Sequence, residues 1–188
     1  VIELELSVLK RLDSGAFMYC KHLQKVSLAM ITHLGEGVFR YCPALRDVHL
    51  PRITHIGNFA FENCTALRDV HFPTLTHIGN FAFGNCTALR NVHLPGIKDL
   101  VAAAFEGCVR LESVTLSAAM EHIGYESFTG CSSLRAISLA GSGVTEIEDN
   151  TFEDCSSLAT VVLSDSVASI DFRAFQYCKR LQTINFPP

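Results

Sequence analysis

Long apolar runs are absent from this 188-residue sequence. A helix that spans a bilayer needs about 20 consecutive apolar residues, so we expect no direct membrane insertion by this segment. Clusters of lysine and arginine are also absent, and the net charge is −4 with a pI of about 6.0. Surfaces that bind nucleic acid are basic because they contact phosphates, so we expect no nucleic-acid partner.

The residue patterns of common catalytic sites are missing as well. The sequence has no glycine-rich phosphate loop, no isolated carboxylate pair, and no serine or cysteine that stands out beside a histidine and an acid. Its cysteines do not show the C-x2-C spacing of zinc sites. The sequence therefore predicts a protein that is not an enzyme and that holds no cofactor and no structural metal.

What the sequence has instead is a period. Its eight cysteines recur every 22 to 24 residues, at positions 20, 42, 64, 86, 108, 131, 155 and 178. A phenylalanine stands three residues before each cysteine and a leucine three residues after it. Two adjacent copies, residues 43–64 and 65–86, are identical at 17 of 22 positions. One cysteine per period indicates a structural role for a buried thiol rather than a disulfide framework.

Each copy changes its periodicity internally. Phenylalanine, cysteine and leucine at intervals of three predict a short helical or 3₁₀ turn with one buried face. The Val/Ile-x-Leu/Phe stretch that follows alternates like a half-buried strand. A unit this short cannot bury its own apolar side, but stacked units can. We therefore expect nine strands in a stacked ladder, with Val1 already in the first strand and Phe186 closing the last.

The repeated unit resembles a known family. The segments are HIGNFAFENCTALRDVHFP and HIGYESFTGCSSLRAISLA, and both are similar to the BspA-like, or Treponema pallidum-type, leucine-rich repeat. The resemblance covers essentially the whole chain. It implies an α/β solenoid, a right-handed superhelix of about eight repeats with short helical or 3₁₀ turns and a parallel β-sheet on its concave side. It also implies a cell-surface or secreted protein, because many members are surface antigens linked to cell adhesion.

The ends of the chain suggest a fragment. The sequence has no initiator methionine and no secretory leader, and neither end carries the polar capping segment that solenoids usually need. We expect residues 1–188 to form a single leucine-rich repeat domain excised from a longer protein.

Strand alternation predicts which side chains face the concave side. They are those that flank the central Val or Ile of each strand, and the N-terminal half of the set is acidic and rich in histidine. Our candidate partner-binding residues are Asp47, His49, Asp69, His71, Asn91, His93, Ser113 and Thr115. The predicted function is protein–protein recognition, with a host or extracellular-matrix protein as the partner.

Two alternatives remain open from the sequence. An intracellular scaffold could use the same face, since the cysteines are expected to be unpaired. The row of His49, His71 and His93 could instead bind a metal, with Asp47 and Asp69 close by, although parallel ligands suit a metal less well than converging ones. A second row, at His33, His55, His77 and His122, is interpreted as solvated.

Overall fold

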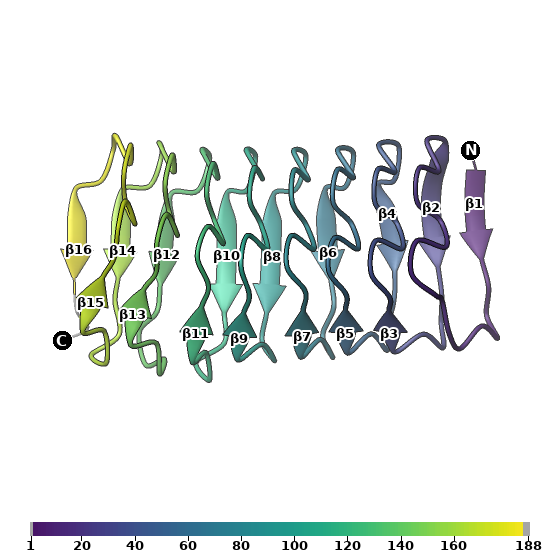
Figure 1. Cartoon of the computed structure of the whole chain (residues 1–188), viewed down its shortest axis with the longest axis horizontal. Coiled ribbons are helices and arrows are strands. Elements are labelled where there is room, and N and C mark those ends of the chain that lie inside the picture. Colours follow the sequence, from purple (N-terminus) through teal and green to yellow (C-terminus); the bar gives the residue numbers. More distant parts are fainter. Residues whose placement is uncertain (1, 186–188) are drawn as a thin grey trace.

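The computed structural model describes residues 2–185, in which the chain winds into stacked coils (Figure 1). Each coil contributes one longer strand to one side of the stack and one two-residue strand to another. The longer strands are β1 (Ile2–Glu5), β2 (Leu23–Ser27), β4 (Asp47–His49), β6 (Asp69–His71), β8 (Asn91–Leu94), β10 (Ser113–Leu116), β12 (Ala136–Ser138), β14 (Thr160–Val162) and β16 (Thr183–Asn185). The short strands are β3 (His33–Leu34), β5 (His55–Ile56), β7 (His77–Ile78), β9 (Asp99–Leu100), β11 (His122–Ile123), β13 (Glu146–Ile147) and β15 (Ser169–Ile170).

The nine longer strands predicted from the sequence are all present among the described residues, and every recorded pairing is parallel. The pairings follow the expected register except at Ile2, where the pairing of β1 with β2 shifts by one residue. The predicted strand positions of Val1 and Phe186 lie outside the described residues. The ladder of longer strands is not continuous, because it forms three three-stranded sheets, β1-β2-β4, β6-β8-β10 and β12-β14-β16. The first interruption falls where Asp47 and Asp69 would lie opposite each other. Like charges on adjacent strands are destabilising.

The interior is built from columns of identical residues. Successive rings of the main phenylalanine column lie 5.3–5.8 Å apart, centroid to centroid, and are nearly parallel. Stacking of like residues on like residues, which the period predicted, is therefore confirmed. The column consists of Phe17, Phe39, Phe61, Phe83, Phe105, Phe128, Phe152 and Phe175.

The cysteines form a second column, and all eight are free. From Cys42 onward each thiol donates to the carbonyl oxygen of a phenylalanine in the preceding coil, with Sγ–O distances of 3.1–3.3 Å. The contact satisfies the thiol donor inside the core, where an unpaired polar group is costly. Burial also raises the pKa of the seven thiols from Cys42 onward, to about 12 for Cys108. They are therefore held as inert packing groups rather than as nucleophiles.

The predicted helical or 3₁₀ turns are not found: the described residues contain turns at these positions but no helix. In the coil around Phe61, the N–H groups of Ala60 and Glu62 donate to carbonyls three residues back. The N–H groups of Phe59, Phe61 and Asn63 donate instead to the next coil, at 2.8–2.9 Å. Phe59 and Asn63 have φ values of 56° and 60°, which no right-handed helix contains. The turn thus forms a third ladder between coils.

Glycine follows four of the seven short strands in the described chain, β3, β5, β7 and β11, and at Gly79 and Gly124 it is required by the closeness of the coils. A Cβ added at Gly79 would lie 2.3 Å from the backbone nitrogen of Asn58, and one added at Gly124 would lie 2.8 Å from that of Ala102. Both distances are shorter than real Cβ contacts allow, so the coil spacing itself selects glycine here. No helix in the described part of the chain is long and apolar enough to cross a bilayer.

Candidate functional site

The outward side of the longer strands, called the long-strand face below, carries the predicted partner-binding residues. The central residue of each strand points toward the core; Val70 and Val92 are buried, Val48 and Val114 are partly buried, and Ile184 in the last strand is exposed. The neighbours of the central residue point outward because successive side chains of a strand lie on opposite faces. All eight predicted residues are exposed on adjacent strands β4, β6, β8 and β10: Asp47, His49, Asp69, His71, Asn91, His93, Ser113 and Thr115.

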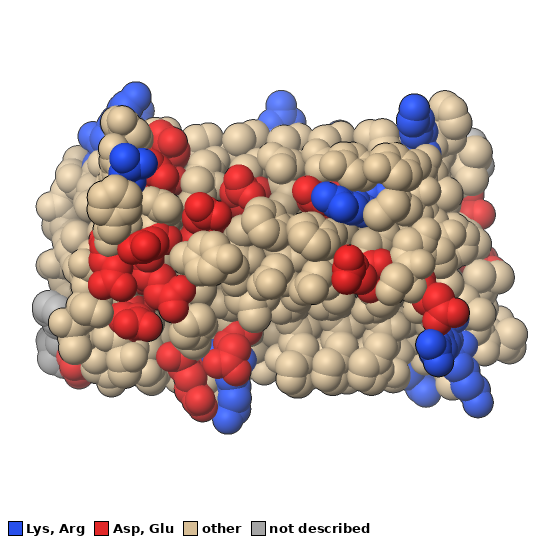
Figure 2. Space-filling model, in the orientation of Figure 1, with Lys and Arg blue, Asp and Glu red and all other residues tan. Residues whose placement is uncertain are grey.

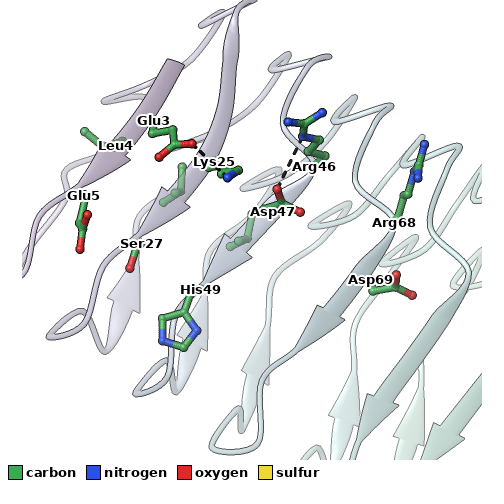
Figure 3. Close-up of a pocket in the computed structure, with 12 residues that line it drawn as sticks. Glu3, Leu4, Glu5, Lys25, Ser27, Arg46, Asp47, His49, Arg68 and Asp69 are labelled. Carbon is green, nitrogen blue, oxygen red and sulfur yellow. Dashed lines mark ion pairs between the residues drawn. The ribbon is translucent and has the colours of Figure 1, made fainter. Parts of the chain in front are cut away.

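A shallow groove of about 620 Å³ runs over β1, β2, β4 and the start of β6 (Figure 3). Lys25 Nζ lies 3.0 Å from Glu3 Oε1 across the paired strands β1 and β2. On the next coil, Arg46 Nε lies 3.6 Å from Asp47 Oδ2. These ion pairs are exposed and therefore contribute little to stability, which leaves their charges available to another molecule.

Other charges in the groove have no partner of opposite sign. Among the described residues no ion pair joins Glu5, Arg68 or Asp69 to another side chain, and Figure 3 draws no dashed line from any of the three. Beyond β10 the long-strand face becomes neutral, with Thr160 and Thr183 among its outward residues. The graded face predicted from the sequence is therefore present, with its charged end at the N-terminal coils.

The histidine row expected on this face is only partly formed. His71 and His93 are partners in the register of β6 and β8, but the interruption of the ladder between β4 and β6 leaves His49 outside that register. The metal-binding alternative for these three histidines therefore loses the continuous row on which it depended.

The second row, which the sequence indicated was simply solvated, is more ordered than expected. The rings of His33, His55 and His77 stack with centroid distances of 4.2 and 4.0 Å. Thr54 Oγ1 donates to the Thr32 carbonyl at 2.9 Å, so it can only accept from His55 Nδ1, which also lies 2.9 Å away. This fixes the neutral tautomer of His55 with its proton on Nδ1. Burial lowers the pKa of His55, and the imidazoles of His77 and His33 lower it further.

One further cluster of polar side chains was not predicted from the sequence. His122 Nε2 lies 2.8 Å from Glu148 Oε1, and Glu146 approaches both side chains. The signal that could have found it is the replacement of the repeat's glycine by Glu148, one coil after a histidine of the second row. The spacing hides this pair, because 26 residues separate its members.

Comparison with known proteins identifies the repeat. The profile of the BspA type leucine-rich repeat region, which comprises six copies, matches residues 2–108 and 98–188. A comparison with curated proteins finds no significant sequence match.

Solved structures give the same fold. The leucine-rich repeat protein TpLRR of T. pallidum superposes with a TM-score of 0.61 and 24% identity, over 97% of this chain and 72% of that one. A leucine-rich repeat protein of Bacteroides ovatus ATCC 8483 superposes with a TM-score of 0.57 and 26% identity, over 97% of this chain and 60% of that one. The chain thus spans only part of the length of each solved protein. With its repeat, its parallel ladders and its profile match all in agreement, the chain belongs to the BspA type leucine-rich repeat family.

Proposed function

We propose that this chain is a non-catalytic protein-recognition module whose long-strand face contacts the partner. Leucine-rich repeat proteins are generally protein-interaction modules, which is consistent with this role. The observation that carries the proposal is the set of exposed polar and charged side chains, from Asp47 to Thr115, held at fixed spacing on a hydrogen-bonded frame. A rigid frame lowers the entropic cost of binding because little has to be ordered.

The dimensions of the face suggest how a partner would lie on it. Nine strands at about 4.8 Å spacing make a face roughly 38 Å long, and three residues per strand make it about 10 Å wide. Its area of about 400 Å² is half of the roughly 800 Å² that each partner buries in a standard interface. A folded partner must therefore also contact the margin of the face, where Arg46 and Arg68 line the groove.

The partner proposed is a host or extracellular-matrix protein, and the location proposed is the cell surface or the extracellular space. The acidic side chains Glu5 and Asp69, which lack ion pairs in the described chain, favour basic side chains on the part of the partner that enters the groove.

The test uses a biosensor with purified extracellular-matrix proteins as probes. The quadruple variant Asp47→Ala, His49→Ala, Asp69→Ala and His71→Ala should weaken binding by about tenfold or more, since residues at the centre of an interface dominate affinity. Its melting temperature should change little, because the four side chains are exposed.

The matched control is the double variant Thr160→Ala and Thr183→Ala, at the neutral end of the same face. It should bind like the unaltered chain. Binding that survives the quadruple variant would refute the assignment of this surface. Absence of binding to every matrix protein would refute the proposed partner class.

The free cysteines favour a second candidate, an intracellular scaffold that uses the same face. Immunolocalisation of the full-length protein, with and without permeabilisation of the cells, separates the two locations. Labelling that requires permeabilisation would support the scaffold and contradict the surface protein.

A further inference from the structure

The ladder of short strands is interrupted between β11 and β13, and polar side chains gather at the interruption. The five strands β3 to β11 form one sheet, and β13 pairs only with β15 among the described residues. Across this gap, one ligand atom each from His122, Glu146 and Glu148 lie within 4.8 Å of one another. His122 Nε2 is directed at Glu148 Oε1 at 2.8 Å. The side chain of Glu146 makes no hydrogen bond or ion pair within residues 2–185.

The cluster arises where the chain departs from its repeat. Glu148 occupies the position of the glycine that follows the short strand in other coils, such as Gly79 and Gly124. In those coils an added Cβ would meet backbone atoms at 2.3 and 2.8 Å. The coil that contains Glu148 is longer, with 24 residues between Cys131 and Cys155 instead of 22, and it accommodates a side chain there. Val101 and Asp171 replace the same glycine in other coils. Of the three side chains, Glu148 is the one that contacts a histidine of the preceding coil, His122.

The surroundings favour a cation. Figure 2 shows acidic side chains gathered at this end of the molecule, with the lysine and arginine side chains around the edges of the group. Asp149 and Asp171, both exposed, follow β13 and β15 in the sequence and add to the negative charge. Two neighbouring carboxylates repel each other, and His122 can neutralise at most one of them. A bound divalent cation would remove this repulsion.

We propose that His122, Glu146 and Glu148 form a binding site for a divalent transition-metal cation of the zinc type. An imidazole nitrogen with two carboxylate oxygens is a donor set that zinc accepts, whereas calcium and magnesium prefer oxygen alone. Zinc needs its nitrogen and oxygen ligands at about 2.0–2.2 Å, so the three ligand atoms must draw closer together. The side chains of His122 and Glu148 are 44% and 22% exposed, which leaves them free to rotate inward.

Binding exchanges a proton for the metal. In the metal-free site the contact between His122 Nε2 and Glu148 Oε1 holds a proton, and the metal takes its place on Nε2. A neutral imidazole keeps that proton by moving it to Nδ1, whereas an imidazolium releases it to solvent, so affinity falls as the pH is lowered into the range where histidine takes up a second proton. Three protein ligands leave a fourth coordination position open to water.

The experiment is a calorimetric titration of the full 188-residue chain with zinc chloride, run in buffers of different ionisation enthalpy to count released protons. We expect one equivalent of zinc to bind. The single variants His122→Ala and Glu148→Gln should each weaken binding by about tenfold or more, in line with the loss of a ligand or of its support. The matched control is His77→Ala, which removes an exposed histidine from the same column on β7 and should leave zinc affinity unchanged.

Cobalt substituted for zinc separates this site from the thiols. Ligation by nitrogen and oxygen gives weak visible bands, without the intense near-ultraviolet absorption of a thiolate–cobalt bond. The proposal is overturned if zinc fails to bind, if His122→Ala binds as tightly as the unaltered chain, or if the cobalt spectrum shows thiolate ligation. Loss of binding in His77→Ala would overturn it as well, because zinc would then sit on the stacked histidines.

Discussion

Replacing one ring in the middle of the phenylalanine column tests whether the coils support one another. Phe105 is fully buried, and its ring centroid lies 5.3 Å from that of Phe83 and 5.8 Å from that of Phe128. Phe105→Ala leaves a cavity, and core substitutions of this kind cost about 3–5 kcal/mol. We expect the upper end of that range, because two ring contacts worth about 0.5–1.5 kcal/mol each are lost at once.

The control is the same substitution at the first ring of the column. Phe17 is only partly buried and has a single stacked neighbour, Phe39, at 5.7 Å. Full burial of a large apolar side chain contributes about 1.5–3 kcal/mol, so Phe17→Ala should cost only about 1–2 kcal/mol. Urea unfolding followed by circular dichroism measures both values. Equal losses for the two variants would refute the reasoning, because the cost must depend on how many neighbouring coils a ring contacts.

Two further predictions follow from the cysteine column and from the stacked histidines. In native protein, iodoacetamide should leave Cys86 and Cys108 unmodified, since both are fully buried and burial raises their pKa; mass spectrometry that finds them alkylated before unfolding would contradict the packed column. Because the pKa of His55 is lowered in the folded protein, the unfolded chain takes up a proton first as the pH falls. The free energy of unfolding should therefore decline below the ordinary histidine pKa of about 6.5 and level off below the pKa of His55 in the folded protein. Urea titrations at several pH values should show a smaller decline in His55→Asn than in the control His93→Asn, which lies outside the stack; identical pH profiles would exclude a contribution from the stack.

Much of the fold follows from the sequence because its period is so regular. Once 22 residues bring the chain back to an equivalent position, Phe61, Phe83 and Phe105 must share a column, and the residues that flank each strand valine must face outward. The candidate face, from Asp47 to Thr115, was predicted by this alternation and lies exposed as expected. The prediction of helical or 3₁₀ turns was wrong for a physical reason. An interval of three residues suits a helix. In this chain, however, alternate N–H groups donate to carbonyls of the next coil, so no continuous series of i→i+3 hydrogen bonds forms.

The sequence by itself determined the repeat, its buried columns and the family, since these depend only on which residues recur at the same place in each coil. Tertiary structure alone decided where the ladders are interrupted and which polar side chains meet there. The stack of His33, His55 and His77 and the approach of His122 to Glu148 depend on distances between coils and on side-chain rotation. A period fixes position around the coil, but it does not fix the space between one coil and the next.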